Sequence, residues 1–271
     1  MDQQRDYSWL GGFELDETFR NLSTPIQWTL VSVLMEGSMS NSSWTNGLIA
    51  VALSAAIVVF PLAARAKKGT EIPAPAIDAA LAQTSGQESV VFAGGCFWGI
   101  QAVFQHVNGV ISATSGYSGG EAKTADYEVV STGQTGHAES VKVVFDPSQI
   151  TYGQLLHVFF SVAHDPTELN RQGPDEGTQY RSVVFYTSPD QLRITKAYIE
   201  QLNAAHVFKH EIVTQLVPMK EFYPAEAYHQ NYATVHPDSM YIRFNDAPKV
   251  ENLKKDFPQM YRESPNLVAV K

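Results

Sequence analysis

A single cysteine, Cys96, is the feature that most limits how this chain of 271 residues can fold. One cysteine cannot form a disulfide within the chain, and it cannot supply the ligands of a cysteine-rich zinc site. The fold must therefore depend on a hydrophobic core. The chain has the residues to build one, since 44% of them are hydrophobic and 11% are aromatic, and this composition excludes global disorder.

The charge balance argues against nucleic acid as a partner. The chain has 19 Lys and Arg residues against 28 Asp and Glu residues, which gives a formal net charge of −9. Domains that bind nucleic acid usually carry a basic stripe and a high isoelectric point. We therefore expect no nucleic acid among the partners. The length favours one large domain with an appendage, or two small domains.

An apolar run at residues 48–64, LIAVALSAAIVVFPLAA, is interrupted only by Ser54 and Pro61. It is short for a membrane span and long for the apolar part of a signal peptide. Three interpretations stay open: an uncleaved membrane anchor, an export signal cleaved near residues 64–66, and a buried hydrophobic helix. The basic residues follow the run, which complicates export and by the positive-inside rule places the C-terminal side in the cytoplasm.

From this run we predict a protein attached to a membrane through residues 48–64 or exported, on the periplasmic side if the run is a signal. A cytoplasmic location is the alternative. The predicted organisation is a polar acidic segment at 1–47, the apolar run at 48–64, a Pro/Gly-containing linker at 65–88 and a folded domain at 89–271.

The folded part alternates between strand and helix patterns. Strands are predicted at 89–93, 110–117, 139–145, 182–186 and 211–217, and helices at 97–107, 127–132, 151–164 and 189–206. The last helix follows Ser188, an N-cap residue, and has proline at its first position. This order predicts an α+β, two-layer sandwich with a mixed β-sheet, packed helices, a ferredoxin-like core and a long irregular C-terminal segment.

The surroundings of Cys96 predict a reactive thiol. An apolar strand, the pair Gly94–Gly95 and a helix start place the sulfur at the positive end of a helix, where N–H groups stabilise a thiolate and lower the thiol pKa. A lone cysteine is more often buried and inert. Flanking glycines and the large Phe97–Trp98 pair at the helix start favour a reactive cysteine instead.

The segment GGCFWG, residues 94–99, resembles the signature of A-type peptide methionine sulfoxide reductases. The likeness covers about residues 89–240 and leaves the first 88 residues outside. Seven further segments resemble the family in the same order: YSGG at 117–120, YEVV at 127–130, TGHAE at 135–139, HDP at 164–166, RQGPD at 171–175, GTQYRS at 177–182 and FYPAEAYHQ at 222–230.

The resemblance implies that the chain reduces methionine-S-sulfoxide, free or in oxidised proteins, to methionine. Cys96 would attack the sulfoxide sulfur while Glu139 donates a proton to the oxygen. Two tyrosines would hydrogen-bond the oxygen, an aspartate would hydrogen-bond within the site, and two aromatic residues would enclose the methyl group. The implied catalytic residues are Cys96, Glu139, Tyr127, Tyr180 and Asp175, and the implied substrate-binding residues are Phe97 and Trp98.

The chain departs from the family pattern in one respect, because many members carry further cysteines that resolve the oxidised nucleophile as a disulfide. Here Cys96 would be left as a sulfenic acid that an external thiol reduces: thioredoxin, glutaredoxin or a small thiol. Two other functions stay open, another single-cysteine redox enzyme such as a thiol peroxidase and a catalytically silent sulfoxide-binding module. We expect a monomer without a cofactor, and without a metal because His206 and His210 lack a third ligand.

Overall fold

The computed structural model describes residues 72–269, and the predicted segment 1–47 and apolar run 48–64 lie outside the described residues. The strands are β1 (Glu88–Ala93), β2 (Val110–Ser118), β3 (Ala138–Phe145), β4 (Arg171–Gln172), β5 (Asp175–Glu176), β6 (Val183–Tyr186), β7 (Gln215–Pro218) and β8 (Phe222–Pro224). The α-helices are α1 (Phe97–Gln105), α2 (Tyr127–Val130), α3 (Tyr152–Val158), α4 (Pro189–Ala204), α5 (Tyr232–Val235) and α6 (Ala247–Asp256). Shorter or wider turns are η2 (Ala122–Thr124), η3 (Phe159–Ala163), η4 (Thr178–Tyr180), η5 (Ala227–His229) and η6 (Ile242–Asp246).

Six of these strands form one mixed sheet in the order β7-β6-β1-β3-β2-β8. β6 and β7 are parallel, and the other neighbours are antiparallel. The central order β6-β1-β3-β2, connected through α1 and α3, is the split β-α-β arrangement of a ferredoxin-like core. The predicted α+β class with a mixed sheet and packed helices is confirmed.

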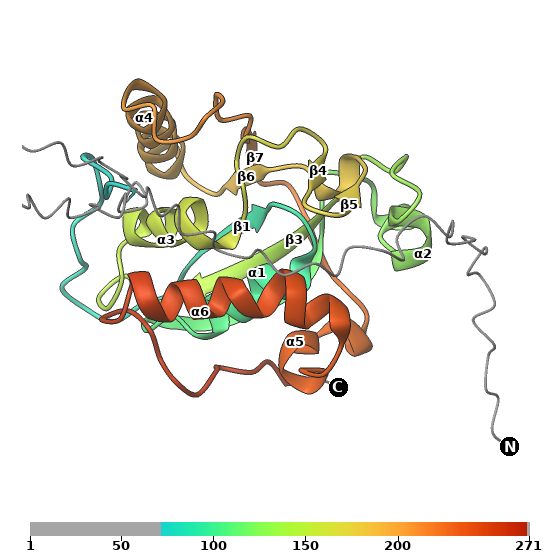
Figure 1. Cartoon of the computed structure of the whole chain (residues 1–271). Coiled ribbons are helices and arrows are strands. Elements are labelled where there is room, and N and C mark those ends of the chain that lie inside the picture. Colours follow the sequence, from blue (N-terminus) through green and yellow to red (C-terminus); the bar gives the residue numbers. More distant parts are fainter. Residues whose placement is uncertain (1–71, 270–271) are drawn as a thin grey trace, which may run out of the picture. The chain divides into compact units, whose positions relative to one another are not determined.

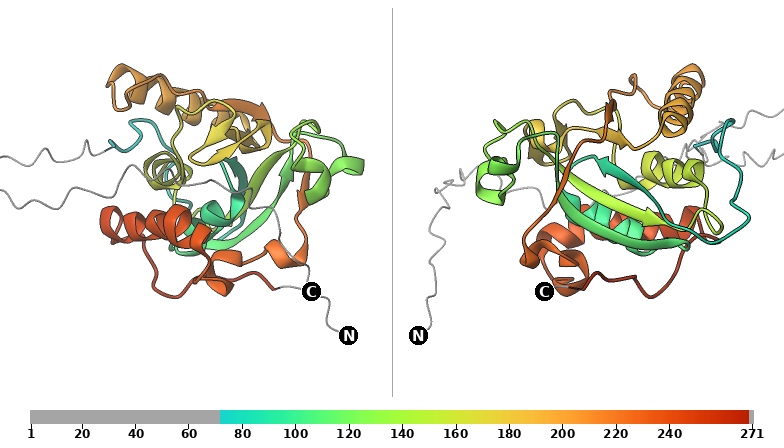
Figure 2. Two further views of the ribbon diagram at one scale, coloured as in Figure 1. Left: turned by 45° about the vertical axis from the view of Figure 1, so that its right-hand side comes forward. Right: turned by 180° about the vertical axis from the view of Figure 1, so that it is seen from behind.

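The sheet is strongly curled (Figure 2). β7 and β8 lie at opposite edges, yet only residues 219–221 separate them along the chain. Three linking residues cannot cross a flat six-stranded sheet, because an extended residue spans at most about 3.6 Å. The curl therefore brings the two edges toward each other, as the right-handed twist of strands allows.

Helices cover one face of the sheet and enclose the main core. α1 contacts β2 and β3, and α6 and η6 in turn contact α1. At the centre of this layer, Phe92 stacks on Phe104 at 5.2 Å and on Phe159 at 4.5 Å between ring centroids. All three side chains are fully buried, which contributes roughly 1.5–3 kcal/mol each to folding.

The starts of α3 and α4 have capping residues that fix where each helix begins. The Ser188 side chain accepts a hydrogen bond from the backbone of Gln191, and a proline follows it, as the sequence predicts. Thr151 and Gln154 form a reciprocal capping box at the start of α3. These caps fix α3 and α4, which pack on each other beside the sheet.

The C-terminal segment is more regular than its weak sequence periodicity indicates. β8 adds an edge strand to β2, and η6 continues directly into α6 (Figure 1). The positions of this helix that face the core are buried or partly buried. They are Ile242, Asp246, Val250, Leu253 and Phe257, and their spacing is that of one helix face. A charged residue at the second of these positions, and proline two residues later, hide the pattern in the sequence.

Residues 72–87, which we call the N-terminal strap, follow the surface of α3 and α4. The Tyr198 hydroxyl donates a hydrogen bond to the Pro73 carbonyl at 2.7 Å. The Asp78 carboxylate accepts hydrogen bonds from the Thr151 hydroxyl and, at 2.7 Å, from the Gly153 N–H. This part of the predicted linker is therefore attached to the folded body at several points.

The predicted membrane-anchored or exported localisation is corrected. Within residues 72–269, no helix is both long and apolar enough to cross a bilayer. The apolar run at 48–64, on which the prediction depended, is not among the described residues.

Candidate active site

A cavity of about 230 Å³ brings the predicted site residues together. They come from elements far apart in the sequence: the start of α1, α2, β3, β5 and η4. All seven line the same cavity, and the eighth lining residue, Tyr241, was not predicted. The lining is Cys96, Phe97, Trp98, Tyr127, Glu139, Asp175, Tyr180 and Tyr241.

The sharp turn between β1 and α1 presents Cys96 to this cavity. Gly95 has a φ of +96°, in the left-handed region that residues with a side chain rarely adopt. Gly94 lies against His164, and a Cβ there would approach its ring to 2.7 Å. Cys96 is the N-cap of α1, so its sulfur lies at the helix end where backbone N–H groups have no acceptor within the helix. The residue is 8% exposed.

Glu139 lies beside this helix start and is 2% exposed. Its Oε2 accepts a hydrogen bond from the backbone N–H of Phe97 at 3.0 Å. Burial raises the pKa of Glu139 to about 8, and the nearby Asp175 and Asp246 carboxylates add to the rise. The Glu139 carboxyl is therefore mostly protonated at neutral pH and able to donate a proton.

The expected direction of the Cys96 pKa is wrong. Burial raises the pKa of the thiol well above its usual value, and the charges of Glu139 and Asp246 raise it further. The Trp98 N–H and the Lys249 ammonium lower it, as the helix-start argument predicts for the N–H. Desolvation of the sulfur outweighs both of these favourable contributions.

Two tyrosine hydroxyls face the cavity. Burial raises the pKa of both Tyr127 and Tyr180, and the Glu139 charge adds to the rise, so the hydroxyls stay protonated. Tyr127 is held by its backbone N–H, which donates to Glu226 Oε1 at 2.9 Å. The cavity therefore offers two O–H donors in addition to the Glu139 carboxyl.

Aromatic rings form the apolar wall of the cavity. Phe97 is 1% exposed, and Trp98 is partly exposed. The Trp98 indole stacks on Tyr232 with centroids 3.8 Å apart and meets the edge of Tyr241 at 5.8 Å. Its Nε1–H donates to His229 Nδ1 at 3.2 Å. C-terminal residues therefore hold the indole by a stack on one face, an edge contact and a hydrogen bond.

Asp175 and Tyr241 close another side of the cavity. The Tyr241 hydroxyl donates a hydrogen bond to Asp175 Oδ2. Burial raises the pKa of Asp175, while this hydrogen bond and Lys249 lower it. Sequence reasoning missed Tyr241 because it lies in the C-terminal part with weak periodicity. The concentration of tyrosines there, between 223 and 241, is the only sequence signal that points to it.

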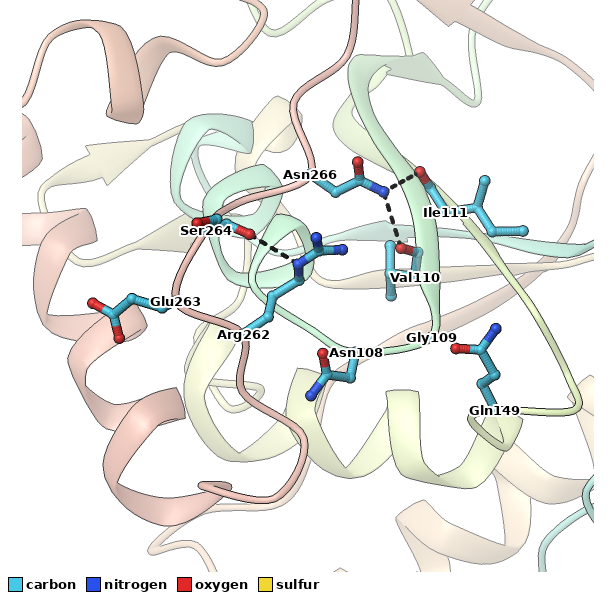
Figure 3. A pocket seen from close by; sticks show the side chains of 9 residues that line it. All are labelled: Asn108, Gly109, Val110, Ile111, Gln149, Arg262, Glu263, Ser264 and Asn266. Carbon is cyan, nitrogen blue, oxygen red and sulfur yellow. Dashed lines mark hydrogen bonds between the residues drawn. The ribbon is translucent and has the colours of Figure 1, made fainter.

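A second hollow, of about 600 Å³, has none of this chemistry (Figure 3). Its side chains bond the protein's own backbone: Asn266 Nδ2 donates to the Ile111 carbonyl at 2.6 Å, and Arg262 Nε to the Ser264 carbonyl at 2.8 Å. The Asn266 bond attaches the C-terminal segment to the start of β2, and the Arg262 bond fixes a turn within that segment. We therefore assign the residues that line this hollow a structural role.

A cysteine at a helix start, next to a buried carboxyl that keeps its proton, defines a cysteine-dependent enzyme on an α+β fold. Comparison with known proteins identifies the family to which this enzyme belongs. Residues 88–261 match the family model described as peptide methionine sulfoxide reductase. The chain belongs to this family, in its A type, and is an oxidoreductase of that kind.

Curated relatives and a solved structure agree with this assignment. The peptide methionine sulfoxide reductase MsrA 2 of Mesorhizobium japonicum is 57% identical over 183 residues, which are 68% of this chain and 94% of that protein. MsrA 2 of Synechocystis sp. is 47% identical over 188 residues, which are 69% and 88% of the two chains. The crystal structure of reduced Mxr1 from Saccharomyces cerevisiae superposes with a TM-score of 0.51, at 32% identity, over 59% of this chain and 94% of that one.

Proposed function

We propose that the chain reduces methionine-S-sulfoxide, free or in oxidised proteins, by direct attack of Cys96 on the sulfoxide sulfur. The observation that carries the proposal is the pairing of Cys96 with a protonated Glu139 in one small cavity. The substrate head group has an oxygen that accepts hydrogen bonds and a methyl group that is apolar. The O–H donors and the aromatic wall of the cavity suit these two parts.

The proposed step balances in atoms and electrons. The Cys96 thiolate attacks the sulfoxide sulfur while Glu139 gives its proton to the oxygen. The oxygen then passes to the Cys96 sulfur, which becomes a sulfenic acid, and methionine leaves as a thioether. Cys96 loses two electrons and the substrate sulfur gains two. Glu139 ends as a carboxylate and is protonated again by water.

Phe97 and Trp98 would hold the methyl group, while Tyr127 and Tyr180 would donate hydrogen bonds to the sulfoxide oxygen. Asp175 would act through the hydrogen-bond network at the side of the cavity. The burial of Phe97, the fixed Trp98 indole and the protonated tyrosines support these roles. As negative charge grows on the oxygen, the O–H donors stabilise it more than they stabilise the ground state.

Recycling needs an external thiol, because the chain has no second cysteine. The thiol condenses with the sulfenic acid, water leaves, and a second thiol releases Cys96 by exchange. We propose thioredoxin as the first reductant to test, since Mxr1, the yeast relative with the same fold, has also been solved in complex with Trx2. Glutaredoxin and small thiols are the alternatives.

One anaerobic single-turnover experiment tests the function. The full chain is mixed with an excess of a peptide that contains one methionine sulfoxide, as either pure epimer, without a reductant. We expect about one methionine per protein from the S epimer and none from the R epimer. A dimedone-type probe should then label Cys96 once, and a prior rinse with thiol should remove the labelling. The Cys96→Ser variant is the matched control.

Other outcomes point to other functions. Tight binding of the peptide without formation of methionine would indicate a silent binding module. Rapid oxidation of Cys96 by hydrogen peroxide, with no reaction on sulfoxide, would indicate a thiol peroxidase. A covalent dimer linked through two Cys96 residues would contradict the proposed recycling by an external thiol.

A further inference from the structure

A buried carboxylate that the proposed mechanism does not use lies behind the first turn of α1. Asp246, at the junction of η6 and α6, is 1% exposed. Its Oδ1 accepts a hydrogen bond from the Lys249 ammonium at 3.1 Å, whereas its Oδ2 is buried without a hydrogen-bond partner. Burying a charge that is only partly satisfied is unfavourable. The pair therefore calls for a functional reason.

Gly99 explains how the pair reaches the helix. A Cβ at Gly99 would lie 2.1 Å from Asp246 Oδ1 and 2.8 Å from the Lys249 Nζ, closer than such atoms can pack. The missing side chain thus leaves room for both charges against the first turn of α1. Gly99 is three residues after Cys96, so the pair lies at the helix end that carries the sulfur. The last glycine of GGCFWG thereby gains a role.

The cavity and its surroundings are rich in acidic groups. Glu139 and Asp175 line the cavity and Asp246 lies behind it, so a thiolate at Cys96 would form among three carboxyl groups. Lys249 provides the opposing charge. Its ammonium favours the negative forms of both Cys96 and Asp175. Because its side chain is 18% exposed, this charge is only weakly screened by water.

We propose that Lys249 is a positioning residue whose positive charge, held near the start of α1, favours the thiolate form of Cys96. Asp246 tethers the ammonium at Gly99, where the ammonium stabilises the thiolate, and the Asp246 charge limits this stabilisation. The proposal rests on Cys96 being the nucleophile proposed above. It concerns the ionisation of the sulfur alone, so it can be tested without a sulfoxide.

The test is the rate of alkylation of Cys96 by iodoacetamide in the full chain as a function of pH. With one cysteine in the chain, alkylation followed by mass spectrometry reports Cys96 alone. The measurements use a Glu139→Gln background, because Glu139 titrates near pH 8 beside the sulfur. Asp175 and the hydroxyls of Tyr127, Tyr180 and Tyr241 also face the sulfur and stay unchanged in every variant.

The two charges predict shifts of opposite sign. Lys249→Met should move the midpoint of alkylation upward by up to about one pH unit, and Asp246→Asn should move it downward by at least as much. Lys249→Arg, which keeps the charge, should leave the midpoint near that of the parent. A purely structural role would shift both variants in one direction, or neither.

Thermal unfolding shows whether each variant is folded. If Lys249→Met does not fold, Lys249→Gln and Asp246→Asn carry the same comparison with smaller changes in shape. An unchanged midpoint in a folded variant that lacks the Lys249 charge overturns the proposal, as do shifts of equal sign. Opposite shifts in a protein that reduces no sulfoxide would overturn the proposed function and leave this inference intact.

Discussion

The backbone N–H of Phe97 donates a hydrogen bond to Glu139 Oε2 across 3.0 Å. This N–H is the first of α1, and the Cys96 side chain at the N-cap accepts no such bond. The Glu139 carboxyl, which comes from β3, therefore caps the N-terminus of α1 in place of the N-cap side chain. The same bond holds the proposed acid beside the proposed nucleophile, so one carboxyl couples the helix start to the chemistry.

Replacing the nucleophile should abolish the reaction. Cys96→Ser puts a hydroxyl, a poor nucleophile toward sulfur at neutral pH, at the same helix start. We expect the single-turnover rate to fall by at least about a thousandfold, the scale for losing an activated nucleophile. Rapid-quench measurement of methionine formation checks this. A variant that kept a larger share of the rate would remove Cys96 from the mechanism.

Glu139→Gln should slow the sulfoxide step by roughly 10²–10⁴, because the amide hydrogen-bonds the oxygen but cannot protonate it. The pH profile should change as well. In the wild type the rate rises with pH as thiolate forms, and then levels near pH 8 as Glu139 loses its proton. In the variant, the much lower rate should keep rising above pH 8. Single-turnover rates from pH 6 to 10 decide this, and identical profile shapes would exclude Glu139 as the acid.

The raised pKa of Glu139 also makes the stability of the protein depend on pH. The folded protein holds this proton up to a pKa of about 8, against an ordinary value of 4.5, so it binds more protons than the unfolded chain between these pH values. The free energy of unfolding should therefore fall as the pH rises through this window, by at most roughly 4–5 kcal/mol. Urea unfolding at pH 5 and pH 9 measures the change. Glu139→Gln should show a clearly smaller one, and equal changes in both proteins would contradict the buried acid.

Tyr241→Phe removes the donor to Asp175 and keeps the ring edge against Trp98. The carboxylate is half-buried, so losing a hydrogen bond to it should lower the free energy of unfolding by about 1 kcal/mol or more. Without this donor the pKa of Asp175 should rise further. Urea titration and the KM for a sulfoxide peptide are the measurements. Tyr232→Phe, which removes a hydroxyl and keeps the stack on Trp98, is the control. Equal effects of the two substitutions would show that the hydrogen bond to Asp175 is not the cause of the loss.

Gly99→Ala should destabilise the protein even though alanine is the better helix former by about 1 kcal/mol. The new methyl group would collide with the Asp246–Lys249 pair, and a clash of this kind costs about 1–3 kcal/mol. Gly86→Ala, whose nearest neighbour is 4.0 Å away, is a matched control that we expect to be nearly neutral. Thermal melts compare the two variants. A Gly99→Ala protein as stable as the control would mean that the ion pair moves aside freely.

Much of the fold follows from local patterns in the sequence. The Gly94–Gly95 turn, the cap at Ser188 and the alternating β3 pattern lead to elements within a few residues of those observed. The predicted site residues also meet in one cavity. At these positions the sequence pattern predicts the observed structure, because a turn, a helix cap and the apolar face of a strand each depend on a few neighbouring residues.

The remainder depends on contacts that no local pattern encodes. Asp246 occupies a core-facing position of the C-terminal helix. This charged residue interrupts the apolar periodicity by which the helix could have been predicted. Tyr241 becomes part of the cavity only because this helix folds back onto α1. The prediction of a lowered Cys96 pKa was wrong for the same reason, because the packing of distant segments decides how deeply the sulfur is buried.

The N-terminal strap has a consequence for the order in which the protein folds. Its hydrogen bonds to the folded body join residues that are 60 to 127 positions apart in the chain, from the Gly86–Asp146 bond to the Ala74–Gln201 bond. Such contacts carry a high loop-closure entropy and cannot form until α3 and α4 exist. The strap should therefore dock last during folding and detach first during local opening. The strap is synthesised before the rest of the body, and its binding surface is complete only after α4 has formed.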